Sequence, residues 1–160
     1  MRRSDREITD LARIEEIIRG CDVLRLGLND GGYPYVVPLN FGFEMLDGLP
    51  VFYFHCALEG KKLELIKNDP RAFFELDRAH RLVLSDDAAR CTMEYESVMG
   101  RGLCAFIEDE AEKLRALRLL LGQYREGAGN MPLRSEAVAV TCAFKLESSQ
   151  ITAKARKVAP

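Results

Sequence analysis

Residues 51–70, VFYFHCALEGKKLELIKNDP, combine an apolar, aromatic strand with the beginning of a short helix. The strand runs through His55 and Cys56, and the helix begins in the segment Gly60–Lys62. The first turn of a helix offers backbone N–H groups without intrahelical partners and the positive end of the helix dipole. Two lysines beside a glycine there favour a bound phosphate, and the preceding strand offers a wall for a flat ring. The segment therefore predicts a site for a phosphorylated, planar ligand.

The size and charge of the chain argue against several other classes of protein. Its 160 residues suit one domain, which we expect to span residues 1–160, and are too few for two full domains. The formal net charge of -2 argues against nucleic-acid binding, because a surface that neutralises phosphates carries excess positive charge. We find no apolar signal-peptide core and no stretch that approaches a membrane span. We therefore expect a cytoplasmic protein without nucleic-acid or membrane partners.

The five cysteines are scattered along the chain, at Cys21, Cys56, Cys91, Cys104 and Cys142. Their number is odd and no two of them have C-x-x-C spacing, which favours neither a disulfide framework nor a zinc ribbon. We interpret them as small buried thiols in a reducing compartment, and we expect no metal site.

The first third of the chain predicts one helix and a hairpin. A capping box at residues 4–7, followed by leucines and isoleucines at helical spacing, predicts an amphipathic helix that ends at Gly20. A turn at residues 29–32 joins predicted strands at 24–28 and 33–43. The proline inside the second strand cannot donate to a ladder, so it indicates an edge position, a bulge or a kink.

The rest of the chain adds strands and a second helix. Strands are predicted around residues 72–76 and over 91–107, where two glycines indicate either one bent or bulged strand or two strands meeting at a corner. Asp109 caps a second amphipathic helix, residues 122–135 are interpreted as loop, and alternation over 138–146 predicts a final long strand. About six antiparallel strands with peripheral helices predict a mainly β protein, a closed or partly closed barrel.

Four motifs in this order carry a family resemblance: GYPYVVPLNFG at 32–42, FHCALEGKKLELI at 54–66, YESVMGRG at 95–102 and EKLRAL at 112–117. They resemble the FMN-binding split β-barrel family that includes pyridoxamine 5'-phosphate oxidase, and in particular its nitroimidazole-resistance (Nim) branch. The resemblance implies a split β-barrel of the FMN-binding type, FMN as cofactor, and a homodimer with two flavins at its interface.

The resemblance also implies which residues form the flavin site. The isoalloxazine is expected to lie along Val36, Val37, Pro38, Leu39 and Asn40. The end of the following strand, Phe54, His55 and Cys56, is expected to border the ring, while Lys61 and Lys62 hold the phosphate. Tyr95 and Ser97 match positions through which the second subunit completes the pocket.

His55 is the candidate catalytic residue, because it matches the histidine associated with the active site in Nim relatives. Imidazole titrates near pH ~6.5, so His55 could donate a proton or hydrogen bond to a substrate at the flavin. The plainer alternatives are a core histidine at position 55, a solvated lysine pair at Lys61 and Lys62, and a small buried thiol at Cys56. Arg101 is interpreted as a surface residue.

Three functions fit this pattern. The first is an FMN-dependent oxidoreductase that passes electrons from NAD(P)H or a partner reductase to a small electrophile such as a nitroaromatic compound. The second is a non-catalytic flavin carrier or sensor, and the third a haem-binding barrel with His55 as an axial ligand. Oxidation of pyridoxamine phosphate is not expected, because the oxidases use a C-terminal segment containing tryptophan and this chain has no tryptophan.

Overall fold

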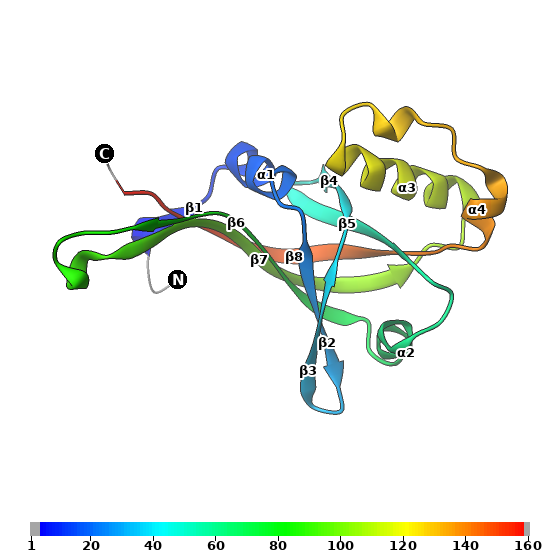
Figure 1. The fold of residues 1–160 in the computed structure, drawn as a ribbon. Helices are drawn as coiled ribbons and strands as arrows, with labels where there is room; N and C mark the ends of the chain where they lie inside the picture. Colours follow the sequence, from blue (N-terminus) through cyan, green and yellow to red (C-terminus); the bar gives the residue numbers. More distant parts are fainter. Residues whose placement is uncertain (1–3, 159–160) are drawn as a thin grey trace.

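The computed structural model describes residues 4–158, in which eight antiparallel strands form one sheet (Figure 1). The strands are β1 (Glu7–Ile8), β2 (Leu24–Asp30), β3 (Tyr33–Leu39), β4 (Gly42–Leu46), β5 (Leu49–Cys56), β6 (Arg71–Val83), β7 (Thr92–Phe106) and β8 (Cys142–Arg156). The helices are α1 (Leu11–Arg19), α2 (Lys61–Asn68), α3 (Glu110–Tyr124) and α4 (Ser135–Ala139), with 3-10 turns at Ser4–Arg6, Ala88–Arg90 and Ala128–Asn130. The predicted mainly β architecture with peripheral helices is confirmed.

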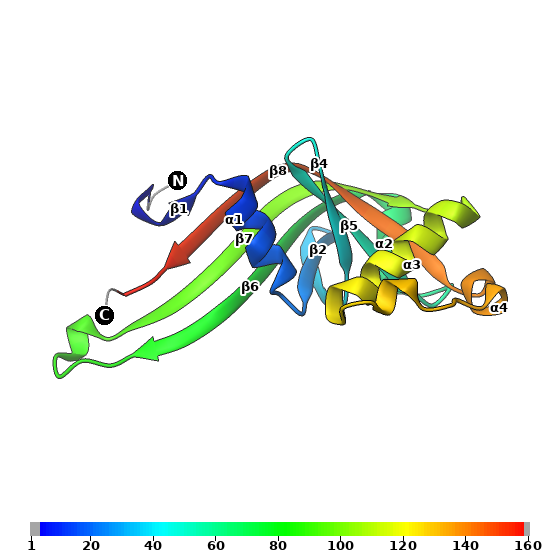
Figure 2. The ribbon, with the colours of Figure 1, turned by 90° about the horizontal axis from the view of Figure 1, so that it is seen from above.

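The sheet curls into a split barrel. Its strand order is β3-β2-β6-β7-β8-β5-β4, with β1 paired to β8 outside this path. The two edge strands, β3 and β4, are joined by residues 40–41 alone, so the sheet must curl until its edges come close together. Among the described residues these edges do not pair with each other, which leaves the barrel split. Figure 2 shows β6, β7 and β8 as long curved strands lying side by side.

Aromatic side chains fill the inside of the barrel. Five phenylalanines are at most 1% exposed, namely Phe41, Phe52, Phe54, Phe74 and Phe144. They pack with the inward-facing leucines of β2 and with the buried isoleucines of α1. A second, smaller cluster lies on the other face of β5, where α3 covers it. The interior is therefore occupied by side chains, and ligand sites must lie on the rim or the outer faces.

The first helix begins later than the capping box predicts. Residues Ser4–Arg6 form a 3-10 turn, and Glu7–Ile8 pair with β8. The chain therefore joins the sheet before the first α-helix begins. Asp10 is the true N-cap, and its side chain accepts a hydrogen bond from the Ala12 N–H at 3.1 Å. The predicted end at Gly20 is confirmed, because its N–H bonds to carbonyls of the last turn.

Two further boundaries differ from the sequence prediction. The segment 33–43 is two strands, because the chain leaves one edge of the sheet after Leu39 and joins the opposite edge at Gly42. The final strand begins at Cys142, not at Val138, because Ser135–Ala139 form a short helix. Val138 is buried by this helix and Val140 is exposed. The alternation of apolar residues at these positions resembles that of a strand, but it does not mark one face of a sheet here. The predicted loop over 122–135 also contains the end of α3 and a 3-10 turn.

The strand β7 resolves the alternatives left open for 91–107. It is one continuous strand whose register with β8 shifts between Arg101 and Gly102, which is a β-bulge. A Cβ added at Gly102 would lie 2.0 Å from the Glu147 carbonyl oxygen, so a larger residue cannot stand at the bulge. Pro38 lies in the edge strand β3, which confirms the edge position among the alternatives.

We expect Gly42→Ala to lower the free energy of unfolding by about 2–3 kcal/mol. A Cβ at this position would lie 2.4 Å from Leu120 N and 2.5 Å from Leu119 C, so β4 would be pushed away from the backbone of α3. Urea denaturation measures the effect. Gly122→Ala is the control, because its Cβ would meet nothing within 4 Å and helical alanine is favoured by about 0.5–1 kcal/mol. Equal midpoints for the two variants would contradict this packing.

Candidate functional site

The corner between β5 and α2 has the open helix start that the sequence predicts. Gly60 precedes the helix with φ 137°, a conformation that L side chains rarely adopt, and provides no side-chain cap. Its carbonyl accepts from Leu63 N at 2.9 Å, so the helix begins directly after it. A Cβ added at Gly60 would meet nothing within 4 Å. The first N–H groups of α2 thus lack a side-chain cap, and the open space beside Gly60 leaves room for an anionic group.

The two lysines at this corner extend in different directions. Lys61 forms an ion pair with Asp30 and its Nζ lies 5.4 Å from the centre of the Tyr35 ring, which ties α2 to the β2–β3 hairpin. The hydrogen bond with Asp30 raises the pKa of Lys61. Lys62 Nζ lies 5.9 Å from the centre of the Phe144 ring on β8. The helix start is thus flanked by a cation on either side.

The strand β3 offers a free backbone edge beside this corner. In the described part of the chain it pairs with β2 alone, so the N–H and C=O groups along its other edge are available to a ligand. Val36, Pro38 and Asn40 are exposed, whereas Val37 and Leu39 are partly buried against the core. The contact of Tyr35 with Lys61 brings this strand to α2. The structure therefore brings the Tyr35 end of β3 to the helix start, and residues 36–40 continue from there along the same strand edge.

The end of β5 presents its predicted residues on two faces. Phe54 is 1% exposed and stacks on Phe144 with ring centres 4.8 Å apart, so only its backbone can border a ligand. His55 is exposed and lies on the face that carries Tyr53, while Cys56 is half-buried on the face of Phe54. The side chains of His55 and Cys56 therefore cannot both contact one face of a ring.

Tyr95 and Ser97 lie far from the lysine pair within one protomer. Leu103 of β7 pairs with Arg71, which follows α2 closely, and Ser97 lies six residues further along the strand. At strand spacing this separation is about 20 Å. Tyr95 instead lines a hollow of about 230 Å³ near the ends of β7 and β8, together with Arg81 and Arg156.

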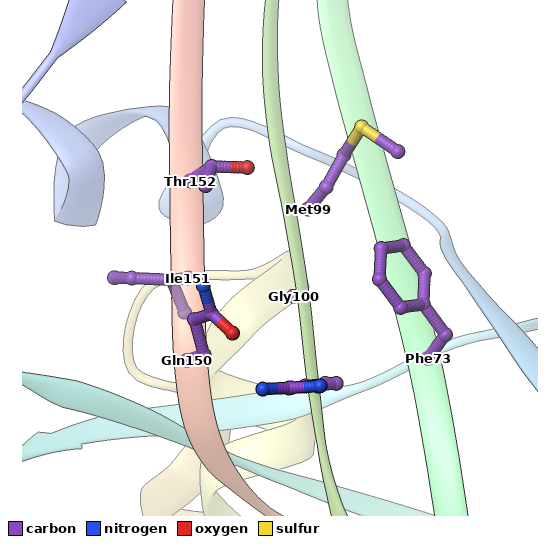
Figure 3. A pocket seen from close by; sticks show the side chains of 7 residues that line it. Phe73, Met99, Gly100, Gln150, Ile151 and Thr152 are labelled. Atoms are coloured by element: carbon purple, nitrogen blue, oxygen red, sulfur yellow. The ribbon is translucent and has the colours of Figure 1, made fainter. Parts of the chain in front are cut away.

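A second feature, a hollowed outer face over the central strands, was not predicted from the sequence. The hollow has a volume of about 190 Å³. Figure 3 shows Phe73 and Met99 on one side of it, Gln150 and Thr152 on the other, and Gly100 of β7 between them. Arg101 also lines it and is shared with a neighbouring hollow of about 410 Å³ beside Leu103. The interpretation of Arg101 as an ordinary surface residue therefore missed its position between two hollows. The available signal was the apolar residues at outward strand positions.

Residues 10–155 match the sequence model of the family described as pyridoxamine 5'-phosphate oxidase. A solved structure of a candidate 5-nitroimidazole antibiotic resistance protein from Bacteroides thetaiotaomicron is 34% identical, and the alignment covers 93% of this chain and 86% of that one with a TM-score of 0.80. This chain belongs to the pyridoxamine 5'-phosphate oxidase family. The family resemblance predicted from the four motifs is thereby confirmed.

Two more distant proteins with a similar fold have descriptions that name flavin or haem proteins. A flavocytochrome from Azotobacter vinelandii is 21% identical, with a TM-score of 0.81 over 100% of this chain and 73% of that one. A protein from Mycobacterium smegmatis described as binding FAD and haem is 16% identical, with a TM-score of 0.82 over 97% and 75% of the two chains. At these identities the similarity shows the fold alone. No curated protein matches this member of the pyridoxamine 5'-phosphate oxidase family.

Residues 4–158 contain no group of three or more histidine, cysteine, aspartate or glutamate side chains arranged to hold a metal ion. None of the helices described is long and apolar enough to cross a membrane.

Proposed function

We propose that this protein binds FMN and uses it to pass electrons from NAD(P)H to a small electrophile, with nitroaromatic compounds as the substrate class. The observation that carries the proposal is the junction of β3 with α2. Asp30 and Tyr35 of the hairpin both contact Lys61, so an unpaired strand edge and an uncapped helix start lie side by side. This combination suits a flat ring that carries a phosphate.

The phosphate would lie at the start of α2. An FMN phosphate is close to a dianion at neutral pH, and it would accept hydrogen bonds from the N–H groups that follow Gly60. Lys61 is more than half exposed and can exchange part of its contact with Asp30 for the phosphate. Lys62 approaches the same point from the β8 side. The ring would then extend along Val36 to Asn40, where the strand edge supplies backbone donors and acceptors.

A second copy of the chain would complete the site. Large apolar side chains are exposed on the outer face of neighbouring strands, with Val36 at 58%, Phe73 at 49% and Leu103 at 54%. Val36, Gly27, Phe73 and Arg101 lie in one continuous row across four strands. Such a row favours burial against another protein surface. In a homodimer, Tyr95 and Ser97 of one protomer would reach the flavin of the other, since they are remote from the lysines of their own.

Bound FMN supplies the redox chemistry of the proposed reaction, and the residues around it hold the reactants. The exposed imidazole of His55 lies at the end of β5, one residue before the strand ends. It is suited to donate a proton to an oxygen of the substrate as electrons arrive. A cytoplasmic location, where NAD(P)H is available, would fit this role.

We expect His55→Ala to lower the turnover of NAD(P)H with a nitroaromatic acceptor roughly 100-fold, while FMN affinity changes little. The rate of NAD(P)H oxidation by purified, FMN-loaded protein measures this. His80→Ala is the control, because His80 lies on β6 with its Nε2 2.7 Å from a carboxylate oxygen of Asp77 and has no proposed role. Wild-type turnover in His55→Ala would remove His55 from the mechanism.

The same preparation tests the function as a whole. A flavin spectrum with acceptor-dependent NAD(P)H oxidation supports the oxidoreductase. A flavin spectrum without turnover on any nitroaromatic tested would favour a carrier or sensor. A haem Soret band in place of a flavin spectrum would overturn the proposal.

A further inference from the structure

Two of the five cysteines lie opposite each other on neighbouring strands of the sheet. Cys56 is the last residue of β5 and Cys142 the first of β8, and the register of these antiparallel strands pairs them directly. Both thiols are free, and Cys142 is close enough to Cys56 to contribute to the raised pKa of that thiol. The sequence spacing of 56 and 142 gave no indication of this pair.

The backbone geometry of the pair suits a disulfide. Directly opposed residues in an antiparallel ladder have Cα atoms about 4.5–5.5 Å apart, whichever kind of pair they form. Disulfides span Cα separations of about 4.4–6.8 Å, so no strand needs to move far for the bond to form. Both thiols are partly accessible, whereas Cys21 and Cys104 are buried. Cys91 lies apart, beside Ser85 in the loop between β6 and β7.

We propose that Cys56 and Cys142 form a reversible disulfide when the protein meets hydrogen peroxide. One thiolate attacks a peroxide oxygen, which gives a sulfenic acid and, after protonation, one water. The sulfur of the second cysteine then displaces the sulfenic oxygen as a second water and closes the S–S bond. In sum, two thiols and one peroxide give one disulfide and two waters, so that the thiols lose two electrons and the peroxide gains them. A dithiol reductant reverses the change by thiol–disulfide exchange.

The surroundings of the pair make this a slow reaction near neutral pH. Burial raises the pKa of Cys56 to about 11, and the neighbouring charge of Lys62 only partly opposes this. The groups facing the thiol are Lys62 of α2 and Cys142 of β8. Because the thiolate is the nucleophile, oxidation should accelerate as the pH rises above neutral. The pair is therefore suited to record sustained oxidation and not to remove peroxide rapidly.

The position of the pair gives the disulfide a structural effect. It would join the end of β5 to the start of β8, next to the loop that leads to Gly60. The ladder between these strands stops at this pair, because β5 ends at Cys56 and β8 begins at Cys142. The bond would fix that end of the barrel. This inference stands whether or not FMN binds at α2.

The test is peptide mapping of the wild-type protein after peroxide treatment. We expect alkylation, proteolysis and mass spectrometry under non-reducing conditions to yield one linked peptide containing Cys56 and Cys142, lost after dithiothreitol. Cys91→Ser is the matched control and should form the same link. Cys56→Ser and Cys142→Ser should each form no intramolecular disulfide while keeping the wild-type circular dichroism spectrum. Recovery of both thiols in alkylated form from folded, peroxide-treated wild type, or a link through Cys91, would overturn the proposal.

Discussion

Replacing Lys61 and Lys62 together with alanine is expected to weaken FMN binding by about 100-fold. A charge-assisted hydrogen bond contributes about 1.5–3 kcal/mol, and two of them would at most double this. We expect about 3 kcal/mol in total, because Lys61 is exposed and already paired with Asp30. The helix start and the edge of β3 remain in the variant, so binding should weaken without being lost.

Fluorescence titration of FMN measures the change, and the same helix supplies the control. Lys67→Ala removes one positive charge from the last turn of α2, where Lys67 Nζ lies 6.0 Å from the centre of the Phe106 ring. We expect unchanged FMN affinity for this variant, because the charge lies at the opposite end of the helix. Equal losses in the two variants would mean that the overall charge, and not a phosphate seat, governs binding.

The largest expected loss of stability comes from Glu96→Gln, at about 3 kcal/mol. Glu96 is 2% exposed, accepts from Arg78 Nε at 2.8 Å, and forms an ion pair with Arg13 of α1. These contacts hold α1 against β6 and β7. The neutral amide of glutamine cannot balance the positive charges of Arg78 and Arg13, so these two partly buried guanidinium groups lose their anionic partner. Thermal and urea denaturation measure the effect, with about 2–4 °C expected for each kcal/mol.

Glu16→Gln is the matched control, since Glu16 contacts the same arginines from the surface with a side chain that is 60% exposed. An exposed ion pair contributes at most about 1 kcal/mol. A loss from Glu16→Gln as large as that from Glu96→Gln would contradict the assigned role of burial.

The Glu96 contribution should also depend on pH. Burial on its own would raise the pKa of Glu96, but the hydrogen bond from Arg78 and the charge of Arg13 outweigh it and leave the pKa lowered. A lowered folded pKa means that the stabilisation is complete above the unfolded pKa of glutamate, and is lost as the pH falls through the folded pKa. The difference between wild type and Glu96→Gln should therefore shrink in acid.

The parts of the fold that local patterns describe could be predicted from the sequence. The β5–α2 corner, the hairpin of β2 and β3 and the Asp109 cap all depend on residues within a few positions of one another. The start of α1 could not, because pairing of Glu7 with Lys154 decides it. The alternation around Val138 failed for a similar reason, since a short helix buried that residue.

The candidate site likewise combines features that depend on local sequence with features that depend on long-range pairing. The helix start at Lys61 could be predicted because a strand, a glycine and a helical pattern follow one another in a single segment, whereas the flavin site at the lysines and residues 36–40 stays a prediction. The hollow at Arg101, the Cys56–Cys142 pair and the burial of Glu96 arise from strands that meet only in the folded sheet. The residues that meet there lie far apart in sequence, so a local pattern by itself could not show which of them come together. The proposed contribution of Tyr95 and Ser97 from a second subunit is likewise a property of the assembly and not of one chain.

The central claim is that the phosphate of the flavin is held at the start of α2, and the direct test compares FMN with riboflavin, which lacks the phosphate. We expect wild type to bind FMN about 100-fold more tightly than riboflavin, and the Lys61→Ala, Lys62→Ala double variant to lose most of this preference. Equal affinity of wild type for the two flavins, or an unchanged preference in the double variant, would contradict the account.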